Sequence, residues 1–121
     1  GNNKVARYND ANTELARRIE EQNPGVFVAS VAGTPGTEPL QRARSMAARS
    51  GKAHFIPLMV VAGEHIMNDV MGDEPASWKN IVGAPDTTCS RSLGYNDKIL
   101  AIYFGHLDAA MARLQSESAV Q

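Results

Sequence analysis

The sequence contains very little cysteine and no long apolar segment, and each of these absences excludes a class of protein. Cys89 is the only cysteine, so an intrachain disulfide is impossible and no cluster of thiolates can bind zinc. The longest apolar run, residues 55–62, is interrupted by Pro57 and is far shorter than the roughly 20 residues that span a bilayer. The sequence therefore predicts no membrane-spanning helix.

Glycine-rich phosphate loops and an excess of charge are also absent. Neither GxGxxG nor GxxxxGK[ST] occurs, and residues 33–36 (GTPG) are too short and lack a lysine, so a nucleotide-dependent enzyme is disfavoured. The formal net charge is −1, which creates no overall field that would attract nucleic acid or an anionic membrane. The local basic residues are more simply interpreted as a solvated helix face: Arg42, Arg44, Arg49 and Lys52.

The composition is that of one soluble globular domain. Of the 121 residues, 43% are hydrophobic and 21% are charged, which is close to the average for such domains. We expect one domain over residues 1–121, with a frayed tail at 115–121. The N-terminus has no initiator methionine and no apolar signal core, so we expect a processed, tagged or truncated chain. A cytoplasmic location is expected, with a periplasmic one as the alternative if a signal peptide lies upstream of Gly1.

Apolar periodicity predicts helices and strands in alternation. Helical spacing predicts helices near residues 10–23, 37–50, 63–71, 77–81 and 96–114, and β-branched or aromatic runs predict strands at 26–31, 54–61 and 87–92. In the last helix, apolar residues recur at alternating spacings of four and three, which predicts a face packed on a core. Such alternation favours a parallel sheet with helices on both faces, a three-layer α/β/α fold. The chain opens with a helix, so the first strand of this fold looks missing.

Ligands of open α/β sheets bind beyond the carboxyl ends of the strands. The residues that directly follow the predicted strands are therefore the candidates for binding. They are Ala32, Gly33 and Thr34 after the first strand, Ala62, Gly63, Glu64 and His65 after the second, and Leu93 and Gly94 after the third.

His65 is the strongest of these candidates. It follows the most hydrophobic strand, beside Glu64 and four residues before Asp69. A neutral imidazole is a good ligand for cobalt, iron, nickel or zinc, and a carboxylate can fix its tautomer. A histidine that merely caps the helix start is the alternative, and Glu64 is either a proton acceptor or an exposed loop acid. His54 and His106 are more simply a half-exposed strand residue and a helix-flank residue.

Residues 54–80, HFIPLMVVAGEHIMNDVMGDEPASWKN, resemble a segment of the anaerobic sirohydrochlorin cobaltochelatases, a family of type II tetrapyrrole chelatases. In that family a similar segment carries a metal-binding histidine. Supporting similarities extend over essentially the whole chain, at residues 26–36, 92–96 and 103–111. The resemblance is to the C-terminal half of such enzymes.

This resemblance implies a chelatase-like half-domain and an ATP-independent lyase that inserts Co²⁺ into sirohydrochlorin in cobalamin or porphyrin biosynthesis. Fe²⁺ and Ni²⁺ are alternative metals, and haem is an alternative tetrapyrrole. His65 would be the metal ligand, and Glu64, beside it, is the candidate stand-in for a catalytic acid–base group. The macrocycle would contact Ala32, Gly33, Gly63, Leu93 and Gly94. An N-terminal half or a second chain, as in a homo-oligomer, would complete the cleft. Neither nucleic acid nor a membrane is expected as a partner.

Two positions depart from the family pattern. The family has a histidine in a His-Gly turn whose glycine matches Gly1, so that histidine would precede the chain. It also commonly has a glutamate in a Val-Glu-Gly pattern, where this chain has Ala32 between Val31 and Gly33. An alanine methyl group neither binds metal nor accepts a proton, so we expect the isolated chain to be a poor catalyst. A non-catalytic tetrapyrrole- or metal-binding domain, or an inactive fragment, is the alternative.

Overall fold

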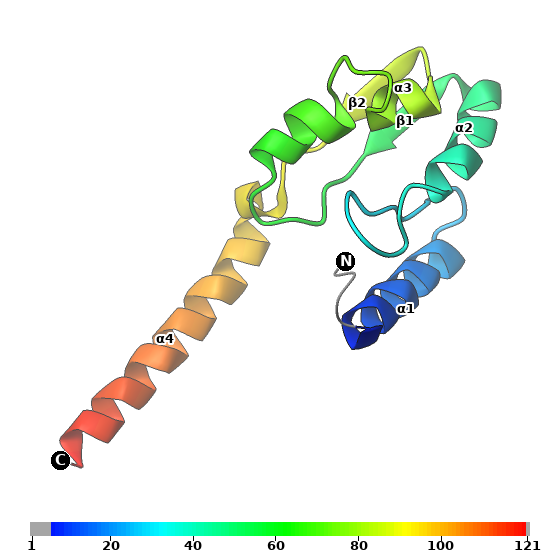
Figure 1. Cartoon of the computed structure of the whole chain (residues 1–121). Helices are drawn as coiled ribbons and strands as arrows, with labels where there is room; N and C mark the ends of the chain where they lie inside the picture. Colours follow the sequence, from blue (N-terminus) through cyan, green and yellow to red (C-terminus); the bar gives the residue numbers. More distant parts are fainter. Residues whose placement is uncertain (1–5, 121) are drawn as a thin grey trace. The chain divides into compact units, whose positions relative to one another are not determined.

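The computed structural model describes residues 6–120 of the chain (Figure 1). These residues form two compact units. The first contains the described part of Gly1–Phe55 together with Gly63–Ser90, and the second contains Ile56–Ala62 together with the described part of Arg91–Gln121. The expectation of one domain over residues 1–121 stays a prediction.

The first unit contains most of the secondary structure. Its elements are α1 (Ala6–Gln22), α2 (Pro39–Ser50), β1 (Lys52–Phe55), the π-helix η1 (His65–Val70), α3 (Trp78–Val82) and β2 (Asp86–Cys89). β1 and β2 pair in parallel, with His54 opposite Thr88 and Phe55 opposite Cys89. Ser90 extends the pairing, because its N–H donates to the Phe55 carbonyl at 2.8 Å. The α/β class and the parallel pairing are confirmed.

The core of the first unit lies between α2, α3 and one face of the sheet. Leu40, Ala47 and Val82 are buried together, and Ala53, Phe55 and Trp78 pack against them. The Phe55 and Trp78 rings meet edge to face with centroids 6.2 Å apart, a favourable geometry for two aromatic rings. Trp78 therefore anchors α3 against this core. The opposite face of β1, which carries Lys52 and His54, is exposed.

The ends of α2 agree with the sequence in one respect and differ in another. Pro39 lies in the first turn, where its missing N–H costs nothing, and Gly51 ends the helix with φ 71°. The Gly51 N–H donates to the Ala47 carbonyl at 2.7 Å. The helix begins one residue later than a cap at Thr37 would place it, because the N-cap is Glu38, whose side chain makes no capping bond.

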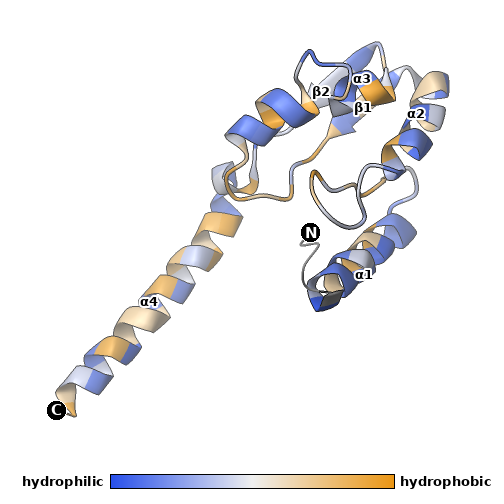
Figure 2. Cartoon of the chain, in the orientation of Figure 1, coloured by the Kyte–Doolittle hydropathy of each residue, from blue (hydrophilic) through white to orange (hydrophobic). Residues whose placement is uncertain are grey.

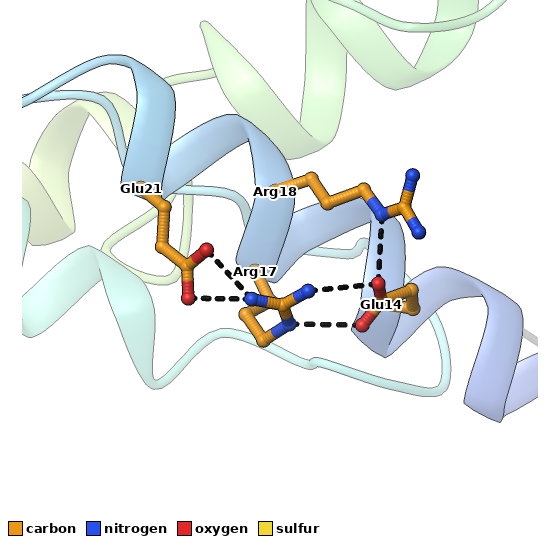
Figure 3. A network of polar contacts seen from close by, with 4 residues as sticks. All are labelled: Glu14, Arg17, Arg18 and Glu21. Atoms are coloured by element: carbon orange, nitrogen blue, oxygen red, sulfur yellow. Dashed lines mark hydrogen bonds and ion pairs between the residues drawn. The ribbon is translucent and has the colours of Figure 1, made fainter.

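Ion pairs cover the solvent face of α1. The Arg17 guanidinium donates to Glu14 on one side and to Glu21 on the other, and Arg18 also donates to Glu14 (Figure 3). Hydrogen bonds from Arg17 and Arg18 lower the pKa of Glu14 to about 2. These pairs are exposed, so their contribution to stability is small.

One ion pair joins α1 to α2. Arg42 Nη1 lies 2.8 Å from Glu20 Oε2, and the hydrogen bond from Arg42 lowers the pKa of Glu20. Glu20 also accepts the Val28 N–H at 2.8 Å, and the Arg42 guanidinium lies 5.1 Å from the centre of the Phe27 ring. The segment that follows α1 is therefore held by side chains.

The strand predicted at residues 26–31 was wrong. This segment has no strand assignment. The Val28 N–H donates to the Glu20 side chain, and the Ser30 N–H donates to the Gly36 carbonyl at 2.9 Å. A strand needs a neighbouring backbone for its ladder, and the sheet of the described residues contains β1 and β2 alone. The other two predicted strands are shorter than expected, and β1 ends two residues before Pro57.

The second unit is built on a pair of short segments and one long helix. Leu93 N–H donates to Met59 O at 2.8 Å, and Gly94 N–H donates to Val60 O at 2.9 Å. The 3₁₀ helix η2 (Leu93–Tyr95) follows, and Asn96 then caps α4 (Asp97–Ala119) through its side-chain oxygen. The start of this helix near residue 96 agrees with the prediction. The helix continues past Gln115 into the segment for which fraying was expected.

The second unit by itself supplies no core for the apolar face that the sequence predicts on α4. Figure 2 shows hydrophobic residues recurring along α4, but the helix has no buried residue. The Phe104 side chain, for example, is 62% exposed. The physical reason is that the second unit offers this helix only η2 and the residue 56–62 segment, which form no second layer against it. None of the helices in residues 6–120 combines the length and apolar character needed to cross a membrane.

Candidate functional site

His65 is the first residue of the π-helix η1, directly after Gly63 and Glu64. The bond from Met71 N–H to Ile66 O, at 2.8 Å, spans five residues, as a π-helix requires. Val70 anchors the helix in the interior of the first unit. The sequence predicted a loop opening into a helix here. It did not predict the π form, which is rare and is often found at functional sites.

The ring of His65 forms a short hydrogen bond with a carboxylate. Nδ1 lies 2.6 Å from Asp69 Oδ2, and the side chains of His65 and Asp69 are 53% and 44% exposed. The imidazole is therefore open to a ligand from solvent and is not sealed among packed side chains. An exposed neutral imidazole with a carboxylate partner is an arrangement typical of a metal ligand.

The other candidate residues of the first unit lie at the start of η1 and in the loop after residue 30. Glu64 is exposed at the N-cap of η1, and a Cβ added at Gly63 would meet nothing within 4 Å. Ala32 lies in the loop after residue 30, where its carbonyl accepts a hydrogen bond from the Ser30 hydroxyl at 2.5 Å. Gly33, in the same loop, has φ 77°. Within residues 6–120, no hydrogen bond joins this loop to His65.

Leu93 and Gly94 belong to the second unit. Their N–H groups are used in the pairing with Met59 and Val60, and a Cβ added to Gly94 would lie 2.5 Å from Val60 O. Gly94 is therefore explained by close backbone packing. Its assignment to the macrocycle stays a prediction.

The described residues contain no group of three or more histidine, cysteine or acidic side chains that could hold a metal ion. Within that part of the chain, the metal-binding chemistry of His65 is limited to one imidazole and its carboxylate partner. Further ligands would have to come from the tetrapyrrole, from solvent or from other protein residues.

A second histidine forms polar contacts that the sequence did not indicate. His54 Nδ1 lies 2.6 Å from Thr88 Oγ1, and Nε2 lies 2.7 Å from Ser90 Oγ. A shallow cavity of about 200 Å³ lies beside them, lined by Lys52, Ala53, His54, Asp86 and Thr88. The only sequence signal was the alternation of polar residues in both strands, and finding the contacts required the register. His54 is an exposed strand residue, close to the prediction.

The remaining candidates agree with the sequence. Cys89 is partly buried, and burial raises the pKa of its thiol, as expected for an unreactive cysteine. His106 is exposed on α4.

Gly72 controls the end of the π-helix. A Cβ added at this position would lie 2.2 Å from the carbonyl oxygen of Asn68, so the backbone beside Asp69 would have to shift. We expect Gly72→Ala to lower the free energy of unfolding by about 1–3 kcal/mol, as overpacking typically does, when measured by urea denaturation. Gly63→Ala is the matched control, because nothing lies within 4 Å of its added Cβ. Equal effects of the two changes would contradict the role of Gly72.

The fold and the site together define a class. A small parallel sheet with helices, followed beyond β1 by an exposed imidazole–carboxylate pair, is consistent with an α/β fold of the chelatase type. Residues 3–112 match the family described as cobalt chelatase (CbiK). The chain belongs to this family, which confirms the resemblance found in residues 54–80.

A curated relative supports the same family. Over 69 residues the chain is 41% identical to the sirohydrochlorin cobaltochelatase of Salmonella typhimurium, a match that covers 54% of this chain and 26% of the relative. The chain thus matches about a quarter of that protein's length. No solved structure matches the chain.

Proposed function

We propose that the chain forms the metal-holding part of a sirohydrochlorin cobaltochelatase, with His65 as the ligand that presents Co²⁺ to the macrocycle. The observation that carries the proposal is the exposed His65 ring, hydrogen-bonded to Asp69 at 2.6 Å, in a chain of the cobalt chelatase family. The activity itself is carried over from the Salmonella typhimurium relative, whose name states it.

Metal insertion requires a ligand that releases its ion and a base that accepts protons. An imidazole binds Co²⁺ through one nitrogen, and such single contacts exchange readily with the nitrogens of a tetrapyrrole. As Co²⁺ enters, the macrocycle loses two N–H protons, so charge is conserved and no electron is transferred. Glu64 is exposed one residue before His65, and we propose its carboxylate as the acceptor for one of these protons, with the other passing to water. The reaction as written consumes no nucleotide.

The finer assignments complete the proposal. The chain would correspond to the C-terminal half of the enzyme, with an N-terminal half or a second copy completing the tetrapyrrole cleft. In the first unit, Gly63 and the Ala32–Gly33 loop would contact the macrocycle, because neither carries a bulky side chain. Fe²⁺ and Ni²⁺ are alternative substrates, since imidazole and carboxylate ligands suit several divalent ions. The product would enter cobalamin biosynthesis, in the cytoplasm.

The proposal is tested by mixing the chain with sirohydrochlorin and Co²⁺ and following the tetrapyrrole absorption spectrum. We expect conversion to the cobalt complex at a rate that is proportional to protein concentration and independent of ATP. The same mixture without protein gives the uncatalysed rate. A rate equal to that background, at every protein concentration, would reject the proposed activity for this chain.

A second candidate is a domain that binds a tetrapyrrole without inserting metal. It is favoured by Ala32, because this residue stands where the family commonly has a glutamate and its methyl group offers no acid–base chemistry. Titration with sirohydrochlorin in the absence of metal distinguishes the two functions. Tight binding combined with a background insertion rate is expected of the carrier alone.

A further inference from the structure

We infer that Asp69 is a positioning residue that selects which nitrogen of His65 is available to the metal. The inference rests on the proposed function and deepens it. It starts from the 2.6 Å distance between His65 Nδ1 and Asp69 Oδ2. Because an ionised carboxylate has no proton to donate, the proton in this bond belongs to Nδ1, and Nε2 keeps its lone pair.

The two residues are held at this distance by η1 itself. They lie four residues apart, a separation that puts side chains on the same face of a helix. The helix is fixed at its far end by the buried Val70 and by the close approach of Asn68 O to Gly72. The orientation of the carboxylate therefore depends on the backbone of η1.

The remaining contacts of the ring agree with this assignment. Within residues 6–120, the hydrogen bonds of the His65 ring are confined to Nδ1, and the side chain is 53% exposed. Nε2 is thus the nitrogen free to coordinate an incoming ion. By contrast, both nitrogens of His54 are occupied by hydroxyls of Thr88 and Ser90.

Asp69 has no need to touch the metal to act in this way. A hydrogen bond to a charged acceptor favours one tautomer by about tenfold or more. Removing a carboxylate that orients a ligating imidazole typically weakens metal binding by about 10–100-fold. Asp69 would therefore act through His65, by keeping Nε2 unprotonated and fixing the plane of the ring.

The test is nitrogen-15 NMR of the histidine rings, at a pH where the imidazoles are neutral, with His65→Ala used to assign the signals. In the wild-type chain we expect His65 to carry its proton on Nδ1. In Asp69→Ala we expect the proton to be shared between the two nitrogens. Asp73→Ala is the matched control, because it removes an equal charge from an exposed carboxylate that pairs with Lys79. It should leave the His65 tautomer unchanged.

Co²⁺ titration of the wild-type chain, Asp69→Ala and Asp73→Ala separates this inference from the proposed function. We expect Asp69→Ala to weaken Co²⁺ binding by about 10–100-fold, and Asp73→Ala to leave it unchanged. A wild-type His65 protonated on Nε2, or a tautomer unaffected by Asp69→Ala, overturns the inference whatever the metal affinity. The expected tautomers without any Co²⁺ binding would instead overturn the proposed function and leave the orienting role of Asp69 standing.

Discussion

Replacing His65 with alanine is expected to reduce Co²⁺ affinity by at least about 100-fold, because loss of a ligand should exceed the 10–100-fold typical of losing its hydrogen-bonded partner. Histidine supplies the nitrogen that the proposed site offers, and Asp69 alone would leave a single exposed carboxylate. Calorimetric titration of the chain with Co²⁺ measures the affinity. Where the chain inserts metal, the insertion rate should fall in parallel.

The matched control for this prediction is His106→Ala. His106 is an exposed histidine on α4, so the change removes an equivalent imidazole from a position outside the proposed site. Its Co²⁺ affinity should equal that of the unaltered chain. If both variants lost affinity equally, the binding would be that of surface histidines in general, and His65 would have no special role.

Leu40→Ala is expected to destabilise the first unit by about 2–5 kcal/mol, the usual cost of truncating a buried leucine. Leu40 is 3% exposed and lies in the cluster with Ala47 and Val82. The change opens a cavity beneath the sheet and removes packing from α2. Urea unfolding, followed by the fluorescence of Trp78, measures the loss, because Trp78 packs against this cluster.

Leu15→Ala supplies the same chemical change at an exposed site. Leu15 is a helical leucine in α1 that is 51% exposed, so its truncation should cost less than about 1 kcal/mol. A loss at Leu40 no larger than the loss at Leu15 would show that the cluster contributes little to stability.

Local patterns predicted most of the helices but not the extent of the sheet. Spacing of apolar residues and capping signals are local properties, so the Asn96 cap and the Gly51 end of α2 could be read directly from the sequence. Strand formation at residues 26–31 depends on a paired neighbour, which no local pattern reports. The apolar residues of α4 were assigned to a core for a similar reason, since periodicity identifies a face but not what covers it.

The candidate site was predictable as one residue and its surroundings. The position of His65 after an apolar strand and beside Gly63 indicated a ligand, and the family resemblance strengthened that interpretation. The π form of η1 and the contact of Nδ1 with Asp69 Oδ2 depend on the local backbone path, which spacing alone does not fix. The contacts of His54 with Thr88 and Ser90 needed the parallel register.

The pairing of β1 with β2 has a further consequence for handling the protein. Over residues 6–120 the sheet contains these two strands alone, so each of them is an edge strand. The amide and carbonyl groups on its outer side lack a partner in the ladder. Unpaired edges are templates on which extended segments of other molecules can add. Two features restrain such growth. Both strands are short, at four residues each, and each begins with a charged residue, Lys52 or Asp86. Concentrated samples should therefore aggregate more readily when these two charges are removed.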